Sequence, residues 1–400
     1  MTVRQRILAA AAATALFALT AGRVRAQANQ SFSVRAENKL AIARNDETIG
    51  ITWADVRARI TEPVPARVRV ECAGVETPSQ TIDNDGDGKP DELIFQQSFF
   101  ARETRTCTVE AAAPRVSVEP RVFILHDEPR DDIAWESDRI AFRIYGEGLK
   151  KTSSAMSSSG IDVWVKSVHA LVVKKWYDKG HDAYHIDTGE GADFFDVGET
   201  LGNGGTAVWR KDTIYRADNF KAWKIIANGP IRAVFELKYD PWPAGGQTVS
   251  ETKRISIDAG QNMYRAESVF RSDNGADIPY VVGVVKRPGM IGTMSKEHPW
   301  AWVTGWGRVS PKDGGHGKLG TAVLIPRDRV TDWKEVFKHY LAVSNARSGQ
   351  PVVHYIGAGW TDSHDFRDVE DWWKFLDDFS ERLASPIAVT LAAGGNRATR

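Results

Sequence analysis

The residues with the greatest chemical potential lie in one run, 181–205, which reads HDAYHIDTGEGADFFDVGETLGNGG. The run contains two histidines, one tyrosine and six carboxylates, and six glycines interrupt it. Because glycine packs little surface and costs backbone entropy, this composition predicts a loop. A loop dense in histidine, tyrosine and carboxylate is a typical way to present proton-transfer groups from a rigid scaffold. The alternative interpretation is a solvated acidic loop with one or two structural histidine contacts.

Acid–base chemistry on a sugar fits the residue types of this loop. Tyr184 and His185 could supply a base and an acid. Asp187, Glu190 and Asp193 could orient the histidine or bind sugar hydroxyl groups. The sequence therefore predicts Tyr184 and His185 as the proton-transfer pair, with Asp187 and Glu190 as further catalytic candidates.

Cations and tryptophans flank the loop. Lys175 or Arg210 could neutralise the carboxylate of a uronic acid, which acidifies the α-proton and opens β-elimination. The alternative for the lysine is a solvated charge at the end of a strand. Trp176 and Trp209 could stack on sugar rings, since indole offers a broad apolar face. At least one tryptophan of this region is expected to belong to the core.

Two further segments have the composition of a ligand-binding cleft. The segment KEHPWAW places His298 among tryptophans and leads to Trp306. The segment HYIGAGW runs from His354 to Trp360 and enters a glycine-rich turn. We expect these four residues to bind substrate, although His354 could equally be a histidine of the core.

The clearest metal signal is the segment DNDGDGKPDE. Its aspartates stand at positions 1, 3, 5 and 9, with glycine at position 6, as in the first part of a calcium loop. Position 12 is Ile94 and no helix is expected on either side, so the segment is not an EF-hand. It resembles the shorter calcium loops of secreted β proteins, and an unmetallated acidic turn is the alternative. The predicted ligands of a structural Ca²⁺ are Asp83, Asp85, Asp87 and Asp91.

Several other chemistries lack their motifs. The sequence has no HExxH or CxxC pattern for a catalytic zinc and no Gly-x-Ser-x-Gly elbow of a lipase-like hydrolase. No glycine pattern for dinucleotides or nucleotide phosphates follows an expected strand, so no organic cofactor is expected.

The beginning of the sequence, residues 1–26, is typical of a secretory signal peptide. Arg4 and Arg6 precede an apolar stretch, and a small-x-small pattern ends at Ala26. The sequence predicts cleavage near Ala26, a periplasmic or secreted protein, and no membrane span. The whole chain has 52 basic and 52 acidic residues, and removal of four arginines with the signal segment leaves 48 basic ones. This slightly acidic balance excludes the usual electrostatic footprint of a nucleic-acid-binding protein.

The two cysteines, Cys72 and Cys107, lie in two expected strands of the first third. An oxidising compartment favours a single disulfide between them.

Short alternating segments separated by Pro, Gly and Asn predict a mostly β protein. Residues 27–115 are expected to form an N-terminal β-sandwich that carries the calcium-type loop. Residues 121–393 are expected to form a larger catalytic β domain, in which 251–257 and 263–271 are the strands of a hairpin. Helices are predicted at 365–383, where apolar residues form one stripe, and more weakly at 332–345. Residues 386–390 are expected to return as a strand.

Four segments together resemble the bacterial family known as domain of unknown function 4861. They are SQTIDNDGDGKPDELIF, GEGADFFDVGETLGNGG, SETKRISIDAGQNMYRAE and IGAGWTDSHDF. The resemblance covers nearly all of the mature chain and implies a galactose-mutarotase-like β-supersandwich with a C-terminal helix. It also implies a secreted protein encoded among enzymes for uronic-acid-containing polysaccharides such as pectin or ulvan. The family has no settled catalytic residues to carry over.

The sequence thus favours a carbohydrate-active enzyme that eliminates across C4–C5 of a uronic acid, as a polysaccharide lyase or an oligosaccharide dehydratase. A uronic-acid-containing oligosaccharide or polysaccharide is the expected partner. Three alternatives stay open: a glycoside hydrolase with two of Asp187, Glu190 and Asp193, a mutarotase-like epimerase, and a non-catalytic sugar-binding protein.

Overall fold

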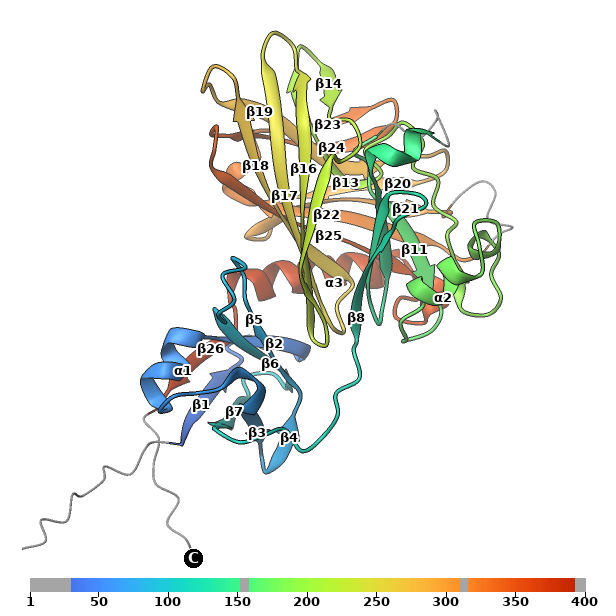
Figure 1. The fold of residues 1–400 in the computed structure, drawn as a ribbon. Coiled ribbons are helices and arrows are strands. Elements are labelled where there is room, and N and C mark those ends of the chain that lie inside the picture. The colour runs from blue at the N-terminus through green and yellow to red at the C-terminus, as the bar shows by residue number, and fades with distance from the viewer. Residues whose placement is uncertain (1–29, 152–157, 310–315, 393–400) are drawn as a thin grey trace, which may run out of the picture.

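The computed structural model describes residues 30–151, 158–309 and 316–392 (Figure 1). The predicted signal peptide, 1–26, lies outside the described residues. Antiparallel strands dominate, and the longest helix stands near the C-terminus, so the predicted fold class is confirmed. None of the helices in this part of the chain has the length and apolar character that a membrane crossing requires.

The N-terminal strands form two small sheets around their own core. One sheet has the order β26-β1-β7-β3-β4, in which β26 (Ala388–Leu391) comes from the C-terminal part of the chain, and the other has the order β2-β6-β5. Apolar residues at alternate positions, such as Phe32 and Val34 of β1 and Val109 of β7, meet in this core. Helix α1 (Trp53–Arg59) begins at Thr52, whose hydroxyl accepts from the Asp55 amide. The strands are β1 (Ser31–Glu37), β2 (Arg44–Thr52), β3 (Arg69–Cys72), β4 (Val75–Thr77), β5 (Ser79–Ile82), β6 (Glu92–Phe99) and β7 (Thr104–Glu110).

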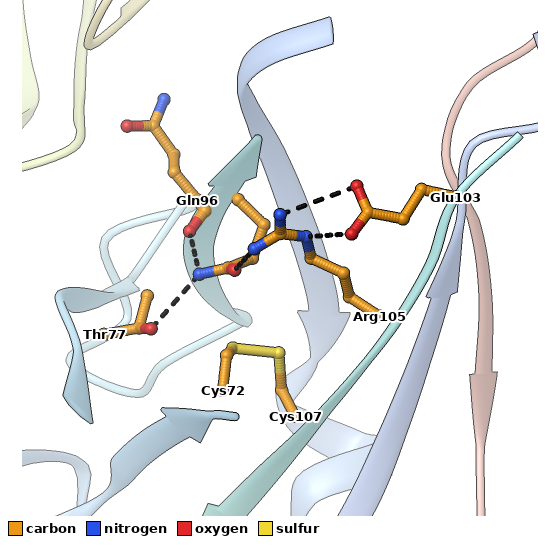
Figure 2. Close-up of a disulfide and its surroundings, with 7 residues drawn as sticks. Cys72, Thr77, Gln96, Glu103, Arg105 and Cys107 are labelled. Carbon is orange, nitrogen blue, oxygen red and sulfur yellow. Dashed lines mark hydrogen bonds and ion pairs between the residues drawn. A yellow bond between two sulfur atoms is a disulfide. The ribbon is translucent and has the colours of Figure 1, made fainter. Parts of the chain in front are cut away.

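A disulfide joins β3 to β7. Cys72 and Cys107 are direct partners in the antiparallel ladder, with Cα atoms 4.1 Å apart. Figure 2 shows the bond beside Arg105, which forms an ion pair with Glu103 at 3.1 Å. The predicted disulfide is therefore confirmed.

We expect reduction of this disulfide to lower the free energy of unfolding. The bond closes a loop over a sequence separation of 35 residues, and a loop of this size is worth about 2–4 kcal/mol through the entropy of the unfolded chain. Chemical denaturation with and without reductant measures the difference, and the double variant Cys72→Ser/Cys107→Ser is the matched control. An unchanged free energy would contradict the expectation.

The larger part of the chain is a supersandwich of three antiparallel sheets, in which the two five-stranded sheets both pack on one face of the eight-stranded sheet. Their orders are β12-β11-β10-β9-β8, β14-β13-β19-β24-β23 and β15-β16-β17-β18-β25-β22-β21-β20. One large apolar core lies between them. The strands are β8 (Val122–Asp127), β9 (Asp132–Ser137), β10 (Ala141–Tyr145), β11 (Asp162–Lys166), β12 (Gly191–Ala192), β13 (Asn203–Arg210), β14 (Thr213–Arg216), β15 (Ala222–Asn228), β16 (Arg232–Pro243), β17 (Thr248–Asp258), β18 (Met263–Ser272), β19 (Ile278–Val285), β20 (Ile291–Ser295), β21 (Trp300–Gly307), β22 (Leu319–Pro326), β23 (Asp332–Val336), β24 (His339–Ala346) and β25 (Pro351–Trp360).

The predicted hairpin is present as β17 and β18. Val249, Ile255 and Ile257 of β17 are buried, whereas Arg254 and Ser256 between them are half-buried on the opposite face. This alternation places one face of the long sheet against the core and leaves the other face polar.

One of the two helix predictions is confirmed and the other is wrong. Helix α3 (Val369–Ala384) is present and buries Trp372, Leu376 and Phe379 against the sheet, while the Asp368 carboxylate caps its N-terminus. The helix predicted at 332–345 is wrong, because this segment forms the hairpin β23–β24. Pairing of β24 with β19 outweighs the local helical pattern.

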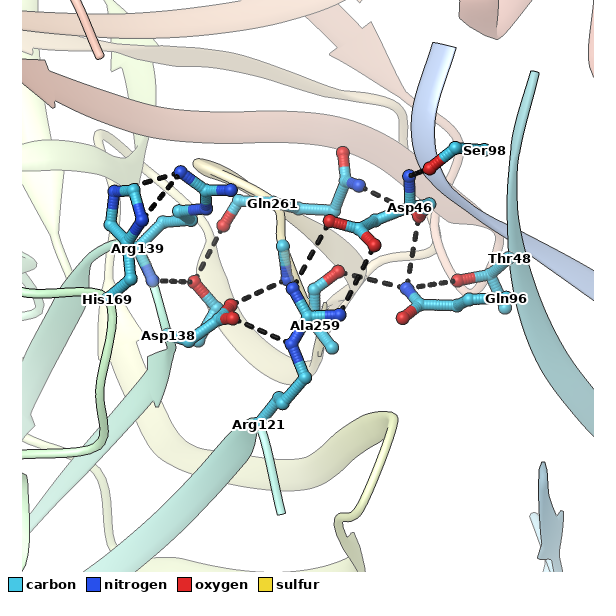
Figure 3. Close-up of polar contacts among 12 residues, drawn as sticks. Asp46, Thr48, Gln96, Ser98, Arg121, Asp138, Arg139, His169, Ala259 and Gln261 are labelled. Carbon is cyan, nitrogen blue, oxygen red and sulfur yellow. Dashed lines mark hydrogen bonds and ion pairs between the residues drawn. The ribbon is translucent and has the colours of Figure 1, made fainter. Parts of the chain in front are cut away.

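The N-terminal sheets and the supersandwich meet in a polar contact. Strand β26 (Ala388–Leu391) follows α3 and pairs with β1, so the end of the chain completes the first sheet. Figure 3 shows Asp46 of β2 held by Gln261 and Arg121. The amide of Gln96 donates at 2.9 Å to the carbonyl of Ala259. Helix α3 crosses between the two parts in Figure 1.

Candidate active site

A cavity of about 510 Å³ lies where the predicted loop covers the sheet of β9, β10 and β11. It has the size of a small-molecule site. Its walls combine charged, imidazole and aromatic groups. The lining residues are Arg143, Tyr145, Asp162, His181, His185, Asp193, Phe194, Phe195, Asp196 and Val197.

The floor of the cavity comes from strands. Phe142 and Ile144 of β10 face the apolar core, so Arg143 between them faces the other way. Register then places Asp162 of β11 directly opposite Arg143. These polar side chains stay buried because helix α2 (Val173–Asp178) and the loop cover this face of the sheet.

The roof is the loop around the 3₁₀ turn Ala183–His185. The Asp193 amide donates to the Tyr184 carbonyl at 2.8 Å and folds the loop back on itself. Gly191 has φ 101° and pairs with β11 so closely that a Cβ would lie 2.1 Å from the Val165 carbonyl oxygen. Only glycine fits there, and this contact fixes Asp193 over the floor.

Arg143 is the centre of a buried ionic network. Its Nε donates to the Asp132 carboxylate at 2.8 Å, and its Nη1 lies 3.6 Å from Asp193 Oδ2. The Tyr145 hydroxyl donates to Asp162 at 3.0 Å. Carboxylates therefore outnumber cations in this buried network, which favours protonation of some of them.

Two carboxyl groups of the cavity, Asp193 and Asp162, have raised pKa values. Burial raises the pKa of Asp193 from 3.8 to about 7, partly offset by the nearby Arg143 guanidinium. Burial, together with the charge of Asp193, raises the pKa of Asp162 well above its usual value. A carboxyl that titrates near neutral pH suits a general acid.

His185 is the candidate proton acceptor of the cavity. Its Nδ1 lies 2.8 Å from the Asp193 carbonyl oxygen and 3.6 Å from the Asp193 carboxylate, and 41% of its side chain is exposed. A neutral ring that donates from Nδ1 to the carbonyl keeps its lone pair on Nε2. His185 can therefore act as a general base, as the sequence predicted for one member of the pair.

Tyr184 is buried and contacts the second histidine of the cavity, His181. Its hydroxyl lies 2.5 Å from His181 Nδ1 and accepts from Arg143 at 3.3 Å, but the residue is only 2% exposed. Burial raises its pKa to about 12. Burial also lowers the pKa of His181, with His185 and Arg143 adding to the effect. The structure thus makes Tyr184 a positioning residue that holds His181, rather than a base in contact with substrate.

The other loop candidates do not line the cavity. Asp187 accepts from the Gly189 and Gly191 amides and shapes the turn. Glu190 pairs with Lys175 at 2.5 Å and accepts from the Trp176 indole at 3.4 Å. Trp176 is 2% exposed in the cluster under α2, so its predicted stacking on a sugar is wrong.

The remaining predicted binding residues are dispersed. His354 and Trp360 are buried in the supersandwich, and Trp306 packs beside α3, so none of the three can bind substrate as predicted. His298 lies between Glu381 and Asp377 of α3. Among the residues the structure describes, none of these four lines the cavity.

Arg210 and Trp209 stand at the far end of β13. Trp209 packs against a separate apolar cluster, and Arg210 contacts the turn at Gly245. Neither lines the cavity, so Arg143 replaces Arg210 as the candidate cation of the site.

The floor of the site was not predicted from the sequence. Arg143 is the single charge of the apolar strand AFRIY, and Asp162 is one of two charges, with Lys166, in the apolar segment IDVWVK. A lone charge in an otherwise buried strand needs a partner or a function, and this was the available signal.

The aspartate loop lies apart from this cavity. Carboxylate oxygens of Asp83, Asp85 and Asp91 lie within 4.8 Å of one another, as a calcium site requires. The fourth predicted ligand, Asp87, instead pairs with Lys89 at 2.9 Å. Structural Ca²⁺ on three of the four aspartates remains a prediction.

We expect chelation with EDTA to lower the melting temperature by a few degrees, since three clustered carboxylates repel one another without a cation. Turnover below the melting transition should not change, because the loop does not line the cavity. Differential scanning fluorimetry measures the shift, with Asp83→Asn/Asp85→Asn as the control that should not respond. An equal melting temperature for the wild type with and without EDTA would mean that the loop binds no Ca²⁺ and is only an acidic turn.

Comparisons with known proteins include one family model that matches most of the chain. Two solved structures from Enterococcus faecalis, a protein in glycosyl hydrolase family 38 and an alpha-mannosidase, superpose with TM-scores of 0.48 and 0.42 at 9% and 8% identity. Each superposition covers 91% of this chain but only 48% and 46% of those chains, so this chain spans about half their length. The uncharacterized protein P7 of Formosa agariphila is 31% identical over 379 residues, covering 90% of this chain and 93% of that protein. A family model described as domain of unknown function (DUF4861) matches residues 36–389. The chain therefore belongs to the DUF4861 family.

Proposed function

We propose that this protein is a periplasmic or secreted carbohydrate-active enzyme that acts on uronic-acid-containing oligosaccharides by β-elimination, as a lyase or a dehydratase. One observation carries the proposal. A single cavity joins a buried guanidinium, a carboxyl with a pKa near 7 and an exposed histidine with a free ring nitrogen. These are the cation, acid and base that an elimination needs.

Each group has one role in the reaction. Arg143 attracts the uronate carboxylate, and the neutral carboxyl groups of Asp162 and Asp193 do not repel it. His185 Nε2 takes the proton from C5, the C4–O bond breaks, and a C4=C5 double bond forms. The protonated Asp193 donates its proton to the departing oxygen. The leaving group is a sugar hydroxyl in a lyase and water in a dehydratase.

The protein should be incubated with oligogalacturonates and with ulvan-derived oligosaccharides while ultraviolet absorbance is followed. An increase from the new conjugated double bond supports elimination, and mass spectrometry separates loss of water from chain cleavage. Cleavage into new reducing ends without absorbance would overturn elimination. Binding without turnover would instead support a sugar-binding protein.

A glycoside hydrolase is the second candidate, because the cavity holds two carboxyl groups with raised pKa values, Asp162 and Asp193. The pair predicted from the loop alone is not brought together, since Asp187 and Glu190 lie outside the cavity. New reducing ends without a double bond, lost in Asp162→Asn, would favour this function.

A further inference from the structure

A second and larger cavity, which we name the interdomain groove, has a volume of about 720 Å³. It lies between β2, the outer face of β16, β17, β18 and β25, and the end of α3 with the segment leading to β26. Among the described residues, none lines both this groove and the candidate active site. The groove is thus a separate site.

The groove has balanced charge. Five arginines and five carboxylates line it: Arg44, Arg232, Arg254, Arg265, Arg382, Asp46, Glu47, Glu92, Asp258 and Glu267. Most are already paired. Arg232 lies 2.6 Å from Asp258, Arg265 lies 2.6 Å from Glu267, and Glu47 holds two arginines. A polyanion would find few free cations here.

Arg254 is the exception at the centre of the sheet. Its guanidinium donates to the side-chain and backbone oxygens of Asn84 at 2.7 and 3.1 Å, with no carboxylate within ion-pair distance in the described ranges. Asn84 in turn donates to Glu92 at 3.1 Å. The floor therefore alternates donors and acceptors.

One wall of the groove is apolar. Tyr355 of β25 is half-buried at the edge of this wall. The Phe379 ring packs against the Tyr355 ring, with centroids 5.5 Å apart. Leu383, Pro386 and Ile387 continue this wall toward β26. A ligand with one polar edge and one apolar face matches such a combination.

We propose that the interdomain groove binds an uncharged stretch of a glycan chain. Sugar hydroxyls both donate and accept hydrogen bonds, so they match alternating guanidinium, carboxylate and amide groups. The C–H faces of the sugar rings pack against Tyr355 and the apolar wall. The polar contacts of Figure 3, in which Asp46 and Gln96 join the two parts of the chain, hold the walls in place before binding.

The first variant of the test blocks the groove without removing a charge. Ser256 lies on the floor of the groove in β17, and Thr252 lies on the same face of the same strand outside it. Ser256→Trp fills the groove, and Thr252→Trp is the matched control. Arg254→Gln is a second variant, in which an uncharged amide side chain replaces the guanidinium. Melting curves verify that each variant is folded.

Binding is measured first on a glycan array of neutral plant and algal oligosaccharides and then by titration calorimetry with the neutral tetrasaccharide that gives the strongest signal. We expect Ser256→Trp and Arg254→Gln to weaken binding at least about tenfold, which is about 1.4 kcal/mol, with Thr252→Trp unchanged. His185→Ala should bind as the wild type does, so the groove is tested independently of the proposed elimination. No binding of any neutral glycan, or equal binding by Ser256→Trp and Thr252→Trp, would overturn the proposal.

Discussion

Replacement of His185 by alanine is expected to lower kcat/KM for uronate elimination by about 10²–10⁴-fold, the usual contribution of a general base. His185 is one of the two exposed histidines that line the cavity, and its Nδ1 contact with the Asp193 carbonyl leaves Nε2 free to accept a proton. The melting temperature of the His185→Ala variant should change little, because a partly exposed loop side chain contributes little packing. The absorbance assay and differential scanning fluorimetry measure the two effects.

His169→Ala is the matched control for this variant. The His169 side chain is 49% exposed, similar to His185, but it contacts Arg139 and Asp365 and does not line the cavity. It should retain full activity. Full activity in His185→Ala would remove this residue from the mechanism, and a large fall in its melting temperature would favour a structural role.

The second large effect is expected at Asp193, where Asp193→Asn should abolish turnover yet stabilise the protein above pH 7. The pKa of Asp193 is about 7 in the folded protein, against 3.8 for an ordinary aspartate. Between pH 3.8 and about pH 7, the folded state therefore holds a proton that the unfolded state has already lost. By linkage, stability is highest below pH 3.8 for this group and is lost as pH rises through about 7.

Asparagine cannot ionise, so this loss of stability should disappear in the variant. Each pKa unit corresponds to about 1.4 kcal/mol, so the expected gain at pH 8 is a few kcal/mol. Urea denaturation at pH 5 and pH 8 measures it, and Asp182→Asn, an exposed carboxylate of the same loop, is the control. A variant less stable than wild type at pH 8 would mean that Asp193 is ionised and serves the Arg143 network.

The pH dependence of turnover should reflect the protonation of Asp193. If Asp193 is the general acid, wild-type kcat/KM falls as pH rises above about 7, since the carboxyl group loses the proton it must donate. Activity that keeps rising up to pH 9 would contradict this role. The Asp182→Asn control should retain the wild-type profile.

Local patterns were sufficient for much of the fold. Alternation along 251–257 and 263–271 predicted the β17–β18 hairpin, and the apolar stripe with acids in its first turn predicted α3. Cysteines in two expected strands of an oxidised protein predicted the disulfide. Each of these features follows from periodicity or residue type within a short window.

The error at 332–345 shows where local patterns fail. Trp333, Val336 and Tyr340 recur at nearly helical spacing, but β24 is buried on both faces and pairs along its whole length with β19. The turn between the strands leaves Phe337 89% exposed. A partner more than fifty residues away in the sequence decides this structure, and no short window contains it.

The sequence by itself determined the class of fold, the disulfide and the loop that carries His185 and Asp193. The tertiary structure alone decided which residues share a cavity. Register between β10 and β11 sets Arg143 opposite Asp162, and the close approach of Gly191 to β11 brings Asp193 above them. The same folding buries Tyr184, Trp176 and His354 away from any ligand. Proton-transfer chemistry depends on burial and on distances of a few ångströms between distant segments, and these exist only after the sheets have paired and the loop has closed over them.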